Sequence, residues 1–499
     1  MFKLSRKPGP EHIESRSPRS FQHNNYLFLA SERQGDANSG LDFCPRPTHI
    51  MRNGSQVTPL RINAPVLSAE SPIQPLGGLA EPGQIIARES DGPDLTTRTV
   101  RIGDIGDCLG LRAGRSAPII HTQLAGSGVG LDAADALPRA LGEAVERYCA
   151  SAFREEQIVR SAALDLGAEA LDLDWVPRCS KTELSNPRCP LRLPDKRAVI
   201  RWVRGLSLLD GSVKYLPAVM TYLYTGILGE AEQFWLPIST GCAAHRSYAA
   251  ALTGATCEVI ERDALSIAWL QELPLPRLEF DRLGGEAAIY WERFQRASTK
   301  FEYFFFDATT DLGVPAVLGI QVCPVDRRRT TLVACGCAPD AETALTKVLR
   351  EMVAHRVSTR QPQPVPSGLD ECTGLTQDAA LMACAEQTGA FGFLLHSGAR
   401  RKISEVASAQ ATGGQSLLSG IIGRFGRRGL DVFAADLTTD EALRCGLKAV
   451  RVLIPSLQPF SYHYRARYLG HSRLYDAPRR MGYKARPEPR INAWPIPFA

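Results

Sequence analysis

The stretch Glu258-Val-Ile-Glu261-Arg262 is the most informative part of the chain, because the same pattern occurs earlier as Glu143-Ala-Val-Glu146-Arg147. In each copy the two glutamates and the arginine stand at positions i, i+3 and i+4. On a helix all three side chains therefore project from one face. A single such motif is usually a salt-bridge ladder on a solvated surface. Two copies with identical spacing predict two helices that present equivalent sets of carboxylates and a guanidinium group.

The residues around the second copy are mostly apolar, among them Ala255, Val259 and Ile260. Its glutamates are therefore expected to be half buried. Burying like charges close together is costly unless cations or metal ions compensate them. Mg²⁺ with a polyphosphate would do so, because hard carboxylate oxygens suit Mg²⁺ and arginines can fork onto phosphate oxygens.

Each of the two expected helices follows a segment of small residues, Gly126 to Gly130 and Ser239 to Ala244. We expect both segments to be loops whose backbone N–H groups can approach an anion. Neither contains the G-x-x-x-x-G-K-[ST] sequence of a Walker A loop, so an ordinary P-loop NTPase is disfavoured.

Outward from the two motifs, the pattern predicts alternating strands and helices. This order favours an α/β domain of the mixed α+β kind. The expected strands are 118–120, 198–203, 213–219, 301–306, 314–322, 431–437 and 449–454, and the expected helices lie within 133–153, 239–270 and 340–356.

Two regions of different texture are predicted. Residues 1–112 are rich in Pro, Arg, Ser, Asn and Gly and form an accessory region, partly ordered, that would offer a docking element for a partner. Its basic residues near the start have a simpler explanation as part of a solvated tail. Residues 113–499 form the main domain.

Composition excludes several classes of protein. The 499 residues are 44% hydrophobic and carry a formal charge of only +5, so nucleic acid is not the default partner. No apolar run approaches the roughly 18 residues that a bilayer requires, and no membrane association is expected. The 13 cysteines contain no C-x-x-C pair, and the residues from Met1 onward do not predict a secretory segment. Buried free thiols in the cytoplasm are the expectation.

Taken in order, these motifs resemble the YcaO family. The segments 140–147 and 258–264 are similar to its two ExxER signatures, and 340–356 is similar to its third helical motif. Residues 450–459 resemble the late strand and turn of members that form azolines, and Pro495-Ile-Pro497-Phe498-Ala499 resembles their proline-rich carboxyl end. The resemblance covers residues 115–499 and implies a YcaO-type fold, with sheets flanked by helices around a central ATP cavity.

The resemblance also implies the cofactors and the residues that bind them. ATP and Mg²⁺ are the expected cofactors. The residues implied to bind them are Glu143, Glu146, Arg147, Glu258, Glu261, Arg262, Lys347 and Glu351, of which the five glutamates would hold the metal. The chain departs from the family pattern where Val129 replaces a lysine, Ala354 a glutamine, His245-Arg246 an asparagine position and Ala499 a proline.

The implied activity is ATP-dependent cyclodehydration of a ribosomal precursor peptide to thiazoline or oxazoline rings, as in bacteriocin biosynthesis. The carboxylate of Ala499, held by Pro495 and Pro497, is the implied proton-transfer group. The precursor peptide and an E1-like or ocin-ThiF-type leader-binding protein are the implied partners, and a homodimer is compatible with the sequence. Two alternatives stay open: a YcaO enzyme with another nucleophile, forming a thioamide or macroamidine, and a non-catalytic scaffold.

Overall fold

The computed structural model describes residues 79–81, 83–104, 123–226, 228–297, 299–361, 363–409 and 416–498. All of them belong to one compact unit, Ile62–Ala499. The strand expected at 118–120 and the terminal residue Ala499 lie outside the described residues. So do most of residues 1–112, and a domain boundary at residue 112 stays a prediction.

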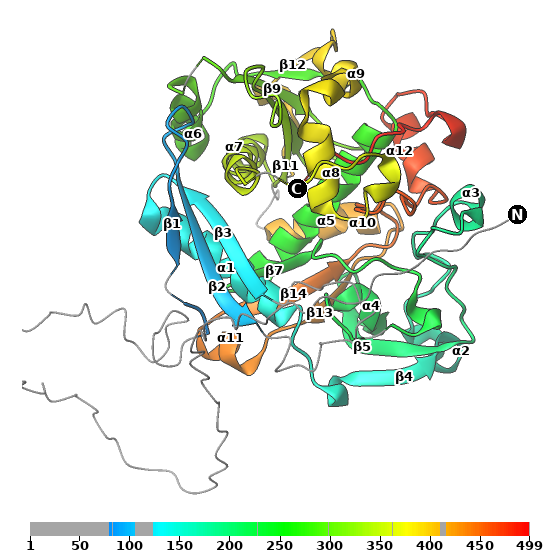
Figure 1. Cartoon of the computed structure of the whole chain (residues 1–499). Coiled ribbons are helices and arrows are strands. Elements are labelled where there is room, and N and C mark those ends of the chain that lie inside the picture. The colour runs from blue at the N-terminus through cyan, green and yellow to red at the C-terminus, as the bar shows by residue number, and fades with distance from the viewer. Residues whose placement is uncertain are drawn as a thin grey trace, which may run out of the picture. The chain divides into compact units, whose positions relative to one another are not determined.

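Three sheets and the helices packed on them confirm the mixed α/β class (Figure 1). The first sheet has the order β1-β2-β3, from Gln84–Ile86, Thr96–Asp104 and Gln123–Gly130. The second has the order β11-β10-β9-β8-β12, from Thr331–Cys337, Ala316–Val322, Glu302–Asp307, Arg277–Glu279 and Arg400–Lys402. The third has the order β4-β5-β13-β14-β7, from Ile158–Ala162, Val199–Ser207, Phe433–Asp436, Lys448–Leu453 and Cys242–His245, with β6 (Val213–Pro217) paired to β5.

The helices include α1 (Ala133–Cys149), α5 (Tyr248–Leu270) and α7 (Ala341–Ser358), which carry the three motifs. The other helices are α2 (Ala163–Leu166), α3 (Lys181–Ser185), α4 (Ala218–Thr221), α6 (Gly285–Gln295), α8 (Leu375–Ala383), α9 (Gly392–Leu395), α10 (Leu417–Gly426), α11 (Asp440–Arg444) and α12 (Arg473–Arg480). In the described part of the chain, no helix is both long and apolar enough to cross a bilayer.

Helix α1 packs directly on strand β3, and this contact explains the run of small residues before it. A Cβ atom on Gly126 would lie 2.1 Å from the Ala140 carbonyl oxygen, and one on Gly128 would lie 2.3 Å from the Ala136 carbonyl oxygen. Gly126 to Gly130 is thus strand rather than the predicted loop. Glycine is needed there because the helix backbone touches the strand.

Helix α5 lies between the two larger sheets, which is why it is apolar on most sides. Its Ile260 and Leu265 belong to a single apolar core with Leu318 and Val333 of one sheet and Val452 of the other. Ser247 begins the helix, because its side chain accepts a hydrogen bond from the Ala250 N–H. The buried setting expected for the second motif is confirmed.

Several predicted strands are confirmed, and others were missed. The strands expected at 198–203 and 213–219 are present as the antiparallel pair β5 and β6, and those expected at 301–306 and 314–322 as the antiparallel pair β9 and β10. The prediction of a loop from Ser239 to Ala244 was partly wrong. Cys242–His245 is strand β7, which pairs with β14. Two strands of the presumed accessory region, β1 and β2, belong to the sheet of β3.

The described cysteines form no disulfide, and most of them are buried, as expected for free thiols.

Candidate functional site

The two ExxER motifs converge on one site. Burial raises the pKa of Glu146 on α1 well above its usual range. Arg147 opposes this rise, while Glu258 on α5 and Glu143 add to it. The effect of Glu258 on Glu146 places the carboxylates of the two helices near one another.

In the first motif, Glu143 is held from both sides. Its Oε2 atom accepts a hydrogen bond from the Ser127 backbone N–H at 2.7 Å, and its Oε1 atom lies 3.3 Å from Nη2 of Arg147. Arg147 also approaches Glu146, with Nη1 to Oε1 at 3.7 Å.

The second motif repeats this arrangement. Oε2 of Glu258 accepts a hydrogen bond from the Gly241 N–H at 3.2 Å, and Nη2 of Arg262 lies 3.7 Å from both Glu258 and Glu261. Oε2 of Glu261 accepts a third backbone bond, from the Cys337 N–H at 3.0 Å.

These contacts correct one expectation about the small-residue segments. The N–H groups of Ser127 and Gly241 donate to carboxylates of the site itself, so these two donors are not available to a phosphate. At these two positions the segments therefore hold carboxylates of the motifs in place.

Helix α7 adds a cation and a further carboxylate. Nζ of Lys347 donates to the Cys337 carbonyl at 2.8 Å, on the same short segment that holds Glu261. The side chain of Glu351 is 49% accessible. Partial loss of hydration, together with the charge of Glu143, raises the pKa of Glu351 to about 7. Burial likewise raises the pKa of Glu261 to about 7, against the opposing charges of Arg262 and Lys347.

Two residues of the site were missed from the sequence. Arg451 on β14 is 1% exposed, and its Nη1 donates to the Ile238 carbonyl at 2.7 Å. Its positive charge opposes the rise in the pKa of Glu146. The only signal in the sequence was a charged residue inside an apolar strand. His355 lies one helical turn after Glu351, with Nε2 at 3.5 Å from its carboxylate and Nδ1 at 2.8 Å from the Val333 carbonyl. Nδ1 therefore carries the proton, because a carbonyl only accepts.

Arg262 retains an unused donor. Its Nη1 atom is buried and has no hydrogen-bond partner among the described residues. A buried guanidinium N–H without a partner is costly, and a phosphate oxygen is a suitable acceptor.

The donor set also fits Mg²⁺. Among the described residues, no three carboxylate, imidazole or thiol groups cluster closely enough to hold a metal ion. Mg²⁺ commonly binds one or two carboxylates together with the phosphates of its nucleotide. Glu143, Glu146, Glu258, Glu261 and Glu351 offer such carboxylates around one site.

The carboxyl-terminal tail reaches the same site. Nε1 of Trp269, at the end of α5, donates to the Trp494 carbonyl at 3.1 Å, and Asn492 Nδ2 returns a bond to the Trp269 carbonyl at 3.1 Å. Pro495 and Pro497 are buried, and Phe498 packs against Arg262. The expected anchoring of the tail is confirmed as far as Phe498, while Ala499 lies outside the described residues.

The structure places four of the residues that depart from the family pattern, and it explains the apolar residue at position 129. Val129 is 3% exposed and packs in an apolar cluster with Leu95 and Val317, where a lysine would be buried. Ala354 packs at the edge of that cluster. His245 and Arg246 are exposed.

With this geometry in place, the family can be assigned. The family model of the YcaO cyclodehydratases, described as ATP- and Mg²⁺-binding, matches residues 127–458, more than half of the chain. The chain belongs to the YcaO family. ATP and Mg²⁺, the cofactors expected from the sequence, are those of this family.

Known YcaO proteins and heterocyclases resemble this chain over large parts of its length. An uncharacterized protein encoded in the tfuA 3′ region of Rhizobium leguminosarum bv. trifolii is 29% identical over 257 residues, which are 48% of this chain and 57% of the relative. A heterocyclase solved in complex with substrate and cofactor is 22% identical with a TM-score of 0.69, covering 84% of this chain and 55% of that one. YcaO from Methanopyrus kandleri, solved with AMPPCP and Mg²⁺, is 20% identical with a TM-score of 0.52, covering 75% of this chain and 86% of that one. The two structural likenesses confirm the fold. The chain spans little more than half the length of the Rhizobium relative and of the heterocyclase.

Proposed function

We propose that this YcaO protein is the ATP-dependent cyclodehydratase subunit that converts Cys, Ser or Thr residues of a ribosomal precursor peptide to thiazolines or oxazolines. The observation that carries the proposal is the convergence of two equivalent Glu–Glu–Arg sets on one site, with an unpartnered N–H on Arg262. A scaffold without turnover has no need of clustered carboxylates that are costly to bury.

The chemistry begins when the substrate side chain adds to the preceding backbone carbonyl. When bound, ATP would supply the phosphoryl group that turns the carbonyl oxygen into a leaving group. The side chains of the site position the reactants and offset charge. Arg147, Arg262 and Lys347 would neutralise phosphate oxygens, and the five glutamates would hold Mg²⁺.

The tail supplies the proposed proton-transfer group. The carboxylate of Ala499 would act there, with Pro495 and Pro497 restricting the backbone that presents it. Burial of Phe498 against Arg262 supports this assignment, because it brings the tail to the motif of α5.

Peptide selection would require help. We propose the precursor peptide and an E1-like or ocin-ThiF-type leader-binding protein as partners, with a homodimer as a compatible assembly. We also propose that the modified peptide is a bacteriocin and that the reaction takes place in the cytoplasm.

Mass spectrometry of a precursor peptide incubated with this protein, its partner and Mg-ATP tests the reaction. Cyclodehydration removes one water per ring, and phosphate is released in equal amount. Replacement of an oxygen by sulfur would assign the protein to thioamide formation instead. Unchanged peptide with no phosphate release would favour the scaffold.

A further inference from the structure

A groove with a volume of about 570 Å³ lies at the carboxyl end of α7, away from the glutamate site. Its walls are the turn between β10 and β11, the end of α7 with the chain that follows it, and helix α8. None of the residues assigned to the nucleotide site lines it.

The groove combines a cationic rim with an apolar floor. Arg328 and Arg360 are exposed at the rim, and neither has an ion-pair partner in the part of the chain that the structure describes. The neighbouring Arg327 differs, because it pairs with Glu386 at 2.6 Å. Leu375, Ala379 and Ala383 of α8 line the floor, together with Val365, which is 47% exposed.

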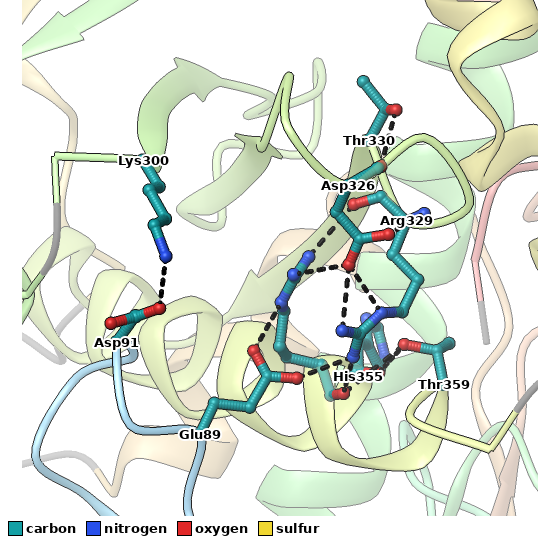
Figure 2. A network of polar contacts seen from close by, with 9 residues as sticks. Glu89, Asp91, Lys300, Asp326, Arg329, Thr330, His355 and Thr359 are labelled. Atoms are coloured by element: carbon teal, nitrogen blue, oxygen red, sulfur yellow. Dashed lines mark hydrogen bonds and ion pairs between the residues drawn. The ribbon is translucent and has the colours of Figure 1, made fainter.

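A network of ion pairs fixes one wall of the groove (Figure 2). Arg329 lies 2.6 Å from Glu89 and 2.9 Å from Asp326, while Arg356 of α7 lies 3.0 Å and 2.9 Å from the same two carboxylates. Asp326 and Arg329 both line the groove. Their charges are compensated within the network, so the unpaired charge that the groove presents comes from Arg328 and Arg360. A wall that is already ordered reduces the entropy lost on binding.

An occupant that complements these features has acidic side chains on one face and apolar side chains on another, as an amphipathic helix does. The position of the groove indicates which polypeptide supplies it. Ser358 in the groove is seven residues after Glu351, about 10 Å along the helix axis at 1.5 Å per residue. A peptide held there is close enough for another part of it to reach the nucleotide site.

We propose that this groove binds an acidic, amphipathic segment of the precursor peptide, outside the residues that are modified. The choice of the precursor as occupant rests on the proposed function. The match of charge and apolar surface between the groove and such a segment is independent of the proposed function.

The first experiment measures binding without nucleotide. A synthetic 16-residue helical peptide of Glu, Leu and Ala, labelled with fluorescein, is titrated with the full chain and followed by fluorescence anisotropy. We expect the double variant Arg328→Glu/Arg360→Glu to bind it at least tenfold more weakly, and Ala380→Trp, which fills the groove, to do the same. The control Arg197→Glu/Arg282→Glu changes two exposed arginines elsewhere and should bind like the unaltered protein. Equal binding by all four proteins, or equal binding of a peptide with Lys in place of Glu, would overturn the proposal.

A second experiment separates this inference from the proposed function. Binding of Mg-AMPPCP, measured by calorimetry, should be the same in the groove variants and the unaltered protein. If none of the proteins bound Mg-AMPPCP, the proposed nucleotide site would be contradicted, but the result for peptide binding in the groove would still hold. Joining the acidic peptide to a Cys-containing acceptor peptide should raise the rate of acceptor modification in the unaltered protein and not in the double variant. Tight binding without this acceleration, while Mg-AMPPCP still binds, would assign the groove to a partner protein and overturn its assignment to the precursor.

Discussion

The guanidinium carbon of Arg262 lies 4.1 Å from the centroid of the Phe498 ring. The same ring meets the imidazole of His355 edge-on, with the centroids 5.0 Å apart. A residue of the carboxyl-terminal tail thus contacts both the second ExxER motif and helix α7. The contact leaves Nη2 of Arg262 facing the glutamates and places an aromatic face over the cation.

Phe498→Ala should therefore weaken the binding of Mg-AMPPCP. A partly buried cation–π contact is worth about 0.5–2 kcal/mol, which corresponds to a loss of roughly 2- to 30-fold in affinity. Isothermal titration calorimetry measures it. Phe498→Leu serves as a control that keeps apolar burial and removes the π face. Full affinity in both variants would mean that the ring only packs.

Deletion of residues 495–499 should reduce peptide modification more than it reduces nucleotide binding. The reason is that the deletion removes the proposed proton-transfer group together with Phe498, while the glutamates and Lys347 stay in place. Modification is followed by mass spectrometry and nucleotide binding by calorimetry. If the truncated protein modified its peptide at the full rate, the proton-transfer group would have to be a side chain of the main site.

Glu258→Gln and Glu261→Gln should each abolish ATP turnover while leaving the fold intact. Glutamine fills the same volume but removes the charge that Mg²⁺ requires. Phosphate release measures turnover, and circular dichroism checks the fold. The control Glu302→Gln changes an exposed carboxylate and should leave phosphate release unchanged. Phosphate release at the normal rate in the site variants would contradict the metal-binding role and would mean that the motifs form only salt bridges.

Affinity for Mg-AMPPCP should rise with pH between about 6 and 8, because carboxylates must lose their protons to bind Mg²⁺. Loss of hydration raises the pKa of Glu261 and of Glu351 to about 7. Binding near neutral pH should accordingly release protons, which titration in buffers of different ionisation enthalpy detects. Affinity independent of pH would contradict the assignment of these two glutamates to the metal.

The same two groups affect stability in the opposite direction. Their pKa values of about 7 lie above the ordinary value of 4.5, so between these values the folded state binds more protons than the unfolded state. Their contribution to the free energy of unfolding therefore falls as pH rises through this window. A double Glu261→Gln/Glu351→Gln variant should lose this part of the pH dependence in thermal denaturation.

Gly128→Ala should destabilise the protein, since the new Cβ atom would lie 2.3 Å from the Ala136 carbonyl oxygen. Forcing α1 away from β3 should cost about 1–3 kcal/mol and lower the Tm. Gly229→Ala is the matched control, because no atom lies within 4 Å of its new Cβ and its φ is −65°. Equal melting temperatures would mean that the helix–strand contact is looser than it appears from the backbone.

Much of the architecture was predictable because its signals are local. The identical spacing in the motifs of α1 and α5 predicted two equivalent sets of carboxylates and arginine, and the cost of burying like charges predicted the need for compensating cations. The strands β5 and β6 were predicted from the β-rich runs 198–203 and 213–219. These features depend on residues close together in the chain.

What could not be predicted depends on contacts between distant segments. Glycine usually indicates a turn, yet Gly126 and Gly128 lie in a strand because a helix backbone touches them. Arg451 is an unexpected charged residue in an apolar strand, and only the folded structure shows that it acts on the carboxylate of Glu146. His355 appears as one more helix residue until Glu351 and Phe498 are placed beside it.

The crowded glutamates also have a consequence for the lifetime of the protein in a cell. A cation that relieves the mutual repulsion of these carboxylates binds only the folded protein and therefore stabilises the native state by mass action. The population of unfolded chains open to proteases would then rise when ATP becomes scarce. Degradation of the protein would follow the energy charge of its cell without a dedicated sensor.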